Sequence, residues 1–154
     1  MNLQIRAAAS ADFAQLHALD QACFAPGIAY SKAELRYFLR YPGNVGLVAV
    51  TDGTGIAGFA IAGIQRRQGT PVGRLITIDV DPEWRRLGVG QALMQAIEER
   101  LRQAGATAIV LEVAVDNLAA QQFYSHHGFT ATGRIPGYYL GRLDALVMEK
   151  PLAA

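Results

Sequence analysis

A strand, a glycine-containing turn and a helix follow one another in Leu75–Arg102, and this order constrains the fold more than any other stretch. The segment 75–80, LITIDV, is β-branched at most positions and stops before Pro82, which has no N–H for a strand ladder. From Val89 the apolar residues recur every four positions, which predicts an amphipathic helix that ends near Gly105. A strand that leads into such a helix indicates an α/β protein.

The predicted helix has one apolar and one polar face. The apolar face carries Val89, Leu93, Ile97 and Leu101. On the polar face Glu98 and Arg102 have the i,i+4 spacing of a favourable ion pair, so we expect them to pair with each other.

The turn before this helix, Arg85–Gly90, predicts an anion site. Gly88 and Gly90 lack Cβ, so the backbone can bend sharply and approach a ligand closely. The first N–H groups of the helix have no intrahelical partners, and the helix dipole favours an anion there by roughly 0.3 to 1 kcal/mol. We expect a pyrophosphate. An ordinary strand-to-helix junction with two solvated arginines is the alternative that a bare G-x-G leaves open.

The segment Ala108–Val115 is almost entirely apolar and contains a single carboxylate, Glu112. A strand that is apolar on both faces is typical of a buried strand in parallel pairing with its predecessor. A carboxylate in such a strand must be hydrogen-bonded, protonated or open to a cleft. The sequence alone leaves open a structural glutamate and a catalytic base.

Two motifs carry a family resemblance. V-x-P-x-x-R-R-x-G-V-G at residues 80–90 resembles the acetyl-CoA-binding motif of the GNAT superfamily of N-acetyltransferases, and N-x-x-A-x-x-F-Y-x-x-x-G-F at residues 117–129 resembles a second GNAT signature. The greatest similarity within the superfamily is to the ribosomal-protein-alanine N-acetyltransferases. The resemblance implies one α/β domain over residues 1–154. It would have a mixed, mostly antiparallel sheet flanked by helices, with splayed parallel central strands.

The resemblance also implies acetyl-CoA as co-substrate, no metal, and a role for individual residues. The glutamate matching Glu112 is the general base and the tyrosine matching Tyr124 is the general acid. Residues matching the following would bind the cofactor: Ile78, Asp79 and Val80 through the strand backbone, Arg86, Leu87, Gly88, Val89, Gly90 and Gln91 at the pyrophosphate, and Asn117 at the cofactor arm. These residue types suit the chemistry, because a protonated amine needs a base before it can attack a thioester and the leaving thiolate needs a proton.

The acceptor is the least determined part of the function. Relatives carry a Trp-Ser pair where this chain has Tyr30-Ser31, and their acceptor loop resembles the segment with Tyr138 and Tyr139. We expect a primary amine, best represented by a protein N-terminal α-amine. A small-molecule amine or amino acid is an alternative acceptor, and a non-catalytic acyl-CoA sensor is an alternative function. Arg74, with the pair at 66–67, is expected on a solvated face, and contact with the ribose phosphate of the cofactor is the alternative.

The amino-acid composition limits which partners and which cellular compartment suit this protein. A formal net charge of +1 favours neither nucleic acid nor a membrane surface as a partner. The single cysteine, Cys23, is expected in the core and excludes an internal disulfide, which suits a cytoplasmic protein with no signal peptide. The sequence leaves monomer and homodimer both open.

The N-terminal half predicts further elements. Ser10 is expected to cap a first helix, and Ser31 with Glu34 forms a capping box for a second. A hairpin is expected over 47–64 with its turn at 51–55, followed by a polar loop over 65–71.

Overall fold

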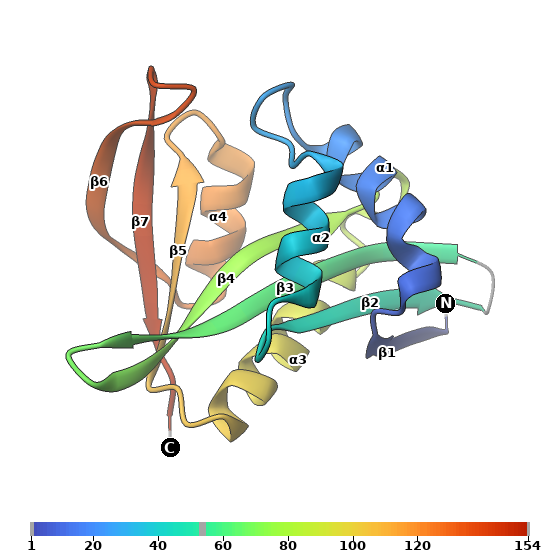
Figure 1. The fold of residues 1–154 in the computed structure, drawn as a ribbon, viewed down its shortest axis with the longest axis horizontal. Coiled ribbons are helices and arrows are strands. Elements are labelled where there is room, and N and C mark those ends of the chain that lie inside the picture. Colours follow the sequence, from blue (N-terminus) through green and yellow to red (C-terminus); the bar gives the residue numbers. More distant parts are fainter. Residues whose placement is uncertain (1, 53–54, 154) are drawn as a thin grey trace.

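A mixed seven-stranded sheet organises the computed structural model, which describes residues 2–52 and 55–153 (Figure 1). The strands lie in the order β1-β2-β3-β4-β5-β7-β6, and every neighbouring pair is antiparallel except β4 and β5. The strands are β1 Leu3–Ala7, β2 Val45–Thr51, β3 Gly55–Arg67, β4 Thr70–Val80, β5 Ala108–Ala114, β6 Thr130–Tyr139 and β7 Leu143–Pro151. The predicted fold class is confirmed.

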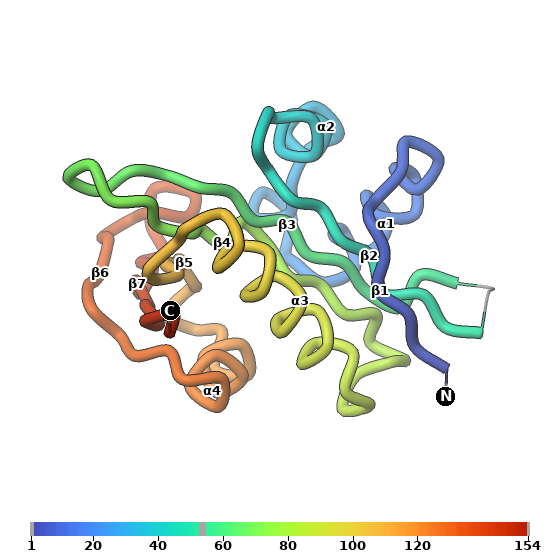
Figure 2. The backbone as a smooth tube through the Cα atoms, turned by 90° about the horizontal axis from the view of Figure 1, so that it is seen from below, coloured from blue at the N-terminus to red at the C-terminus, as the bar shows by residue number. Residues whose placement is uncertain are grey.

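Helices cover both faces of the sheet. They are α1 Phe13–Cys23, α2 Lys32–Arg40, α3 Val89–Gln103 and α4 Leu118–His126, with short 3-10 turns at Ser10–Asp12 and Pro82–Trp84. Figure 2 shows α1 and α2 on one side of the sheet and α3 and α4 on the other. No helix in the described ranges is long and apolar enough to cross a membrane.

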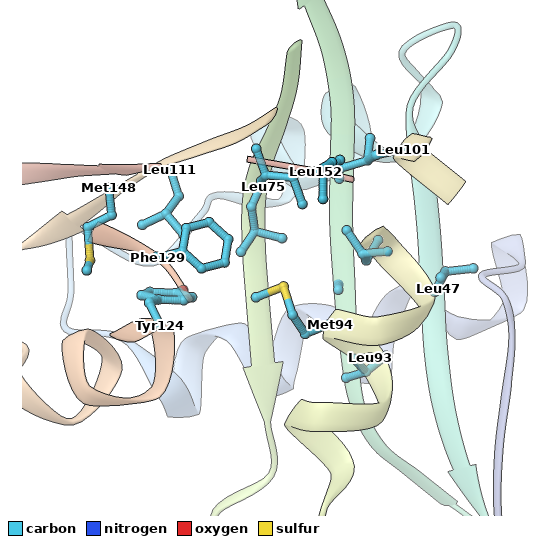
Figure 3. Close-up of a cluster of buried hydrophobic side chains, with 14 of the residues drawn as sticks. Leu47, Leu75, Leu93, Met94, Leu101, Leu111, Tyr124, Phe129, Met148 and Leu152 are labelled. Atoms are coloured by element: carbon cyan, nitrogen blue, oxygen red, sulfur yellow. The ribbon is translucent and has the colours of Figure 1, made fainter. Parts of the chain in front are cut away.

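Each face has its own apolar core. Under α1 and α2 the buried side chains include Leu16, Leu35 and Phe59. Under α3 and α4 the core is larger. Figure 3 shows Leu93 and Met94 of α3 on the same side of the sheet as Tyr124 and Phe129. The predicted apolar face of α3 is fully buried, since Val89, Leu93, Ile97 and Leu101 are each at most 1% exposed. Burial of this face, worth roughly 1.5–3 kcal/mol per large side chain, holds α3 against the sheet.

The central parallel pair is short and then opens. Only Gly73 with Ile109 and Arg74 with Val110 are in register between β4 and β5. Beyond Arg74 the two strands diverge, as Figure 1 shows, and their facing edges no longer form a ladder. The residues of both strands that the sequence predicted for the site lie along this fork.

Local signals were correct at several helix ends. Ser31 Oγ accepts from Glu34 N at 3.1 Å and Glu34 Oε1 accepts from Ser31 N at 2.9 Å, which confirms the capping box. Asn117 Oδ1 accepts from Ala120 N at 3.2 Å at the start of α4. Gly105, with φ of +89°, follows α3 as predicted.

Three local predictions were wrong: the loop at 65–71, the Ser10 cap and the ion pair on the polar face of α3. The loop expected at 65–71 is a hairpin, because β3 continues to Arg67 and β4 begins at Thr70. Ser10 begins a 3-10 turn instead of capping α1, and the carboxylate of Asp12 accepts from Ala9 N at 2.7 Å. The expected turn at 51–55 includes residues 53 and 54, which lie outside the described residues.

The third error concerns the polar face of α3. Arg102 pairs with Glu99 at 3.1 Å, and Glu98 pairs with Lys150 of β7 at 2.8 Å, so Glu98 and Arg102 do not pair with each other. Glu98 is only 7% exposed because β7 lies against it, which periodicity within one helix does not reveal.

Candidate active site

The fork between β4 and β5 opens into a cleft of about 490 Å³. Its walls combine the open edges of both strands with α4, the end of α1 and the segment before α2. Residues predicted for the site that line it are Ile78, Glu112, Asn117 and Tyr124, together with Tyr30, Ile76, Arg85, Ala114 and Tyr139. Arg85 of the first motif and Asn117 and Tyr124 of the second are therefore brought to one cavity.

Glu112 lies in the fork with an ordered carboxylate. Its neighbours Leu111 and Val113 are in the core under α3 and α4, so the alternation of β5 turns Glu112 to the opposite face. Glu112 Oε1 accepts a hydrogen bond from Arg74 Nη2 at 2.7 Å and another from Tyr138 Oη at 3.1 Å. The side chain is 14% exposed, which leaves it open to the cleft. The Glu112 carboxylate is therefore both hydrogen-bonded and accessible from the cleft.

Tyr124 projects from α4 into the same cavity. It is 9% exposed, and its ring packs edge-on against Phe123 and Phe129 with centroids 5.5 and 5.7 Å away. Burial raises the pKa of the Tyr124 phenol above its ordinary value, and the negative charge of Asp79 acts in the same direction. The hydroxyl therefore holds its proton at neutral pH and can act as a proton donor.

The predicted anion turn has the expected backbone. Gly88 is the N-cap of α3 with φ of +85°, and a Cβ there would meet nothing within 4 Å, so its surroundings are open. Arg86 also has a positive φ, of +63°. A Cβ on Gly90 would lie 3.0 Å from Phe123 of α4, so glycine lets α3 and α4 approach closely. The amides of Val89, Gly90 and Gln91 begin the helix and lack i−4 partners within it.

These turn residues do not line the 490 Å³ cleft. Arg85, one position earlier, does line it, and its Nε donates to the carbonyl of Val80 at 3.2 Å. The turn is thus fastened to the end of β4, beside the cleft. Leu87 is 52% exposed on this turn.

The three predicted residues of β4 differ in their surroundings. Ile78 lines the cleft on the open edge of the strand. Asp79 is 1% exposed, and its carboxyl group faces the interior, where Thr77 Oγ1 donates to it at 2.5 Å. Any contact of Asp79 or Val80 with a ligand in the cleft would therefore be made by the backbone.

One residue beside the cleft, Arg74, was not expected there, whereas Tyr30 belongs to the segment 25–30 that was expected to border a substrate groove. Arg74 was predicted on a solvated face, but it pairs with Glu112 and its side chain is 34% exposed. Tyr30 lines the cleft, and its hydroxyl donates to Ile76 O at 3.3 Å. The strand was predicted to begin at Leu75, so Arg74 was left outside it. If β4 had been predicted to begin earlier, its two-residue alternation would have placed Arg74 on the same face as Ile76.

Cys23 is half-buried: it packs against the core under α1 and α2, as expected, and it also lines the cleft. Burial raises the pKa of the Cys23 thiol to about 11, and the charge of Asp79 adds to this effect. The thiol is protonated at neutral pH, which does not suit a nucleophile. Among the described residues no cluster of three or more histidine, cysteine or carboxylate side chains is arranged to hold a metal ion.

Comparison with known proteins places the motifs and the fold in one family. Residues 13–129 match the model of the Acetyltransferase (GNAT) family. The chain is 35% identical over 117 residues to N-alpha-acetyltransferase 30 of Schizosaccharomyces pombe, with 75% of this chain and 77% of that protein covered. It is 33% identical over 107 residues to the [Ribosomal protein bS18]-alanine N-acetyltransferase of Escherichia coli K12, with 68% and 70% covered.

Solved structures agree with this assignment. Ard1 from Thermoplasma volcanium superposes with a TM-score of 0.89 at 28% identity, and all of both chains is covered. The ribosomal-protein-S18-alanine N-acetyltransferase from Escherichia coli gives a TM-score of 0.82 at 26% identity, over 99% of this chain and 96% of that one. The chain therefore belongs to the GNAT family and is an N-acetyltransferase.

Proposed function

We propose that this N-acetyltransferase transfers the acetyl group of acetyl-CoA to the α-amine of a protein N-terminus. The observation that carries the proposal is the cleft itself, which places the accessible carboxylate of Glu112 and the protonated hydroxyl of Tyr124 on its walls. The N-terminal acceptor is supported by the relatives, since those in Schizosaccharomyces pombe and Escherichia coli are named as N-alpha- and ribosomal-protein-alanine acetyltransferases.

The chain has the features that acetyl-CoA requires. The open edges of β4 and β5 present backbone groups that an extended pantetheine arm can pair with, in the manner of an added strand. The start of α3, with Gly88 and Gly90, offers amides to the pyrophosphate. Acetyl-CoA supplies an activated thioester carbonyl. Asn117 lines the cleft, and its side-chain oxygen caps α4 by accepting from Ala120 N. Its side-chain nitrogen can therefore donate a hydrogen bond to the cofactor arm.

Glu112 acts as the general base in this proposal. An α-amine is largely protonated at neutral pH, so a carboxylate must take up its proton before it can attack a carbonyl. Glu112 Oε1 already accepts two hydrogen bonds, and no residue in the described part of the chain donates to Oε2. The free oxygen is therefore the one that can receive the amine proton, directly or through water.

Tyr124 acts as the general acid. It projects from α4 into the cleft, and its raised pKa means that the phenol carries its proton at neutral pH. The hydroxyl can therefore donate a hydrogen bond to the sulfur and pass it the proton as the C–S bond breaks, after which the phenolate regains a proton from water. Each proton transfer of this kind contributes typically about 10² to 10⁴ in rate.

The proposal is tested by acetyl transfer to defined acceptors. Purified enzyme is incubated with acetyl-CoA and three acceptor sets: free-N-terminus peptides, N-blocked lysine peptides, and small amines. Thiol release gives the rate and mass spectrometry locates the acetyl group. We expect transfer to N-terminal α-amines and a fall in kcat of about 10²-fold or more for Glu112→Gln.

Two controls make the result decisive. Coenzyme A should raise the melting temperature of the wild type and of Glu112→Gln equally, which shows that the variant is folded and binds cofactor. Transfer only to small amines would contradict the N-terminal acceptor. Cofactor binding without turnover on any of the three sets would favour a sensor and overturn the catalytic proposal.

A further inference from the structure

Arg74 places a positive charge beside Glu112, where the fork between β4 and β5 begins. It is the last residue of β4 in register with β5, so its side chain extends from the base of the fork. Its Nη2 lies 2.7 Å from Glu112 Oε1 and 3.4 Å from the Tyr138 hydroxyl. The Arg74 side chain is about two thirds buried, and the carboxylate of Glu112 raises the pKa of the guanidinium against the opposing effect of burial.

The Arg74 guanidinium has N–H groups that are not used in hydrogen bonds within the described part of the chain. Its hydrogen bonds to Glu112 and Tyr138 both use Nη2, and among the residues that the structure describes no acceptor bonds to Arg74 Nε or Nη1. A guanidinium presents five N–H groups in a planar fork and binds carboxylates through two of them at once. Arg74 can therefore hold a second anion while it continues to orient Glu112.

The charges of Arg74 and Glu112 indicate which charged groups the acceptor should carry. Arg74 and Glu112 together are neutral, so an ammonium group that approaches Glu112 also approaches the positive charge of Arg74. That repulsion is weak for an exposed pair and stronger in a partly buried cleft. A carboxylate on the same acceptor molecule would offset it by binding the free side of Arg74.

We propose that Arg74 is a specificity-determining residue that binds a carboxylate of the acceptor, so that the enzyme prefers amines with an acidic group nearby. The inference rests on the proposed function and narrows its substrate class. The carboxylate could belong to an Asp or Glu at the start of a peptide, or to a free amino acid.

The surroundings of Arg74 favour the peptide. Arg74 also lines a second groove, of about 160 Å³, whose other walls are mainly aromatic and apolar residues from the end of α2, β3 and β4, with Asn44 and Gln65 as polar members. Three of these are exposed large hydrophobics: Tyr37 at 58%, Tyr41 at 50% and Ile64 at 37%. A free amino acid would not reach this groove, whereas the next residues of an extended peptide would cover it.

The test compares acceptors that differ only in charge. Peptides that begin Ala-Asp and Ala-Asn form one pair, and free alanine and alaninamide form the other. A charge-assisted bond of this kind corresponds to a preference of about tenfold or more in kcat/KM. We expect the wild type to prefer Ala-Asp over Ala-Asn by that factor, and to prefer peptide over free alanine.

The variants separate recognition from positioning. Arg74→Gln loses the charge and should bring the Asp-to-Asn ratio close to one, even though its absolute rates also fall because Glu112 is less well oriented. Arg66→Gln is the matched control, since Arg66 lies on the same hairpin, is exposed, and donates from Nη1 to Gly69 O. It should keep the full ratio. Stabilisation by coenzyme A verifies that both variants are folded.

Failure of this inference differs from failure of the proposed function. Equal rates on Ala-Asp and Ala-Asn by an active wild type would overturn the role of Arg74 and leave N-terminal acetylation intact. A preference that survives in Arg74→Gln would also overturn it. A charge preference confined to free alanine over alaninamide would support the carboxylate contact and overturn the peptide as its source. No acetylation of any N-terminus would overturn the proposed function itself.

Discussion

Asp20 of α1 and Asp79 of β4 place two carboxyl groups against each other in the interior, where they are 0% and 1% exposed. Tyr30 N donates to Asp20 Oδ2 at 2.7 Å, and Thr77 Oγ1 donates to Asp79 Oδ1. The remaining oxygens, Asp20 Oδ1 and Asp79 Oδ2, have no hydrogen-bond donor among the described residues. One proton shared between them would satisfy both. Burial, followed by the bond to Asp20 and its charge, raises the pKa of Asp79 well above its ordinary range.

This pair predicts a pH dependence of stability. Because the pKa of Asp79 is higher in the folded chain, the folded chain binds more protons than the unfolded chain above about pH 4, so its contribution to stability falls as the pH rises from there through the folded pKa. Asp79→Asn supplies an amide N–H in place of the proton. We expect this variant to melt higher than the wild type at pH 8, by about 2–4 °C for each 1 kcal/mol gained, and to lose the difference near pH 4.

Thermal melts between pH 4 and pH 8 test this expectation. Glu83→Gln removes an exposed carboxylate from the turn after β4 and is the control for a general effect of charge. A constant difference between Asp79→Asn and the wild type across this range would show that the pair shares no proton.

Tyr124→Phe should separate catalysis from binding. The substitution removes one oxygen and keeps the ring contacts with Phe123 and Phe129. If the phenol protonates the leaving thiolate, kcat should fall by about 10²-fold while the stabilisation by coenzyme A is retained. Steady-state kinetics at saturating acceptor measure the change. Tyr139→Phe is a comparison on the opposite wall of the cleft, where burial raises the pKa of the phenol to about 12, and a fall there as large as that at Tyr124 would argue against a specific acid.

Local sequence signals predicted the parts of the site that lie within one element. The four-residue period of α3, the glycines at its start and the Asn117 cap all depend on neighbours in sequence, and the structure has them as expected. The pairing of Arg74 with Glu112 could not be predicted this way, because the two residues meet only where β4 and β5 share their short register.

The same reason explains the missed carboxyl pair. Asp79 looked like an ordinary polar residue in a β-branched strand, and Asp20 lay in a helix whose apolar phase was already accounted for. Only the packing of α1 across β4 brings the two together and removes water from both. Whether a polar side chain is buried depends on contacts between elements that are distant in sequence. Hydrophobic periodicity shows only which face of a single helix or strand is apolar.

Gly88 should be a position where even alanine is costly. Its φ of +85° lies in the left-handed region, which disfavours side chains by roughly 1–2 kcal/mol, although a Cβ would meet no atom within 4 Å. Gly88→Ala is therefore expected to lower the melting temperature by about 2–8 °C through backbone strain alone. Gly55→Ala is the matched control, since it has equally open space without a positive φ, and it should be close to neutral. Equal effects of the two substitutions would contradict the strain.

Lys150 and Glu98 predict an energetic link between the two halves of the sheet. Lys150 Nζ of β7 bonds Glu98 Oε1 of α3 at 2.8 Å, and their side chains are 24% and 10% exposed. Removal of one partner leaves a mostly buried charge unpaired, so Lys150→Met should destabilise the chain by about 1–3 kcal/mol. Replacement of both residues by methionine removes the unpaired group, and the double variant should recover most of that loss.

Chemical denaturation of the wild type, both single variants and the double variant gives the coupling free energy directly. Arg102→Met removes the exposed pair with Glu99 and the bond from Arg102 Nε to Ala153 O, and as the comparison it should change stability by less than about 1 kcal/mol. If losses at Lys150 and Glu98 simply added in the double variant, the bond between α3 and β7 would contribute nothing to stability. Coupling of about 1 kcal/mol or more would instead show that this contact helps hold α3, and with it the Gly88 turn, against the C-terminal strands that flank the cleft.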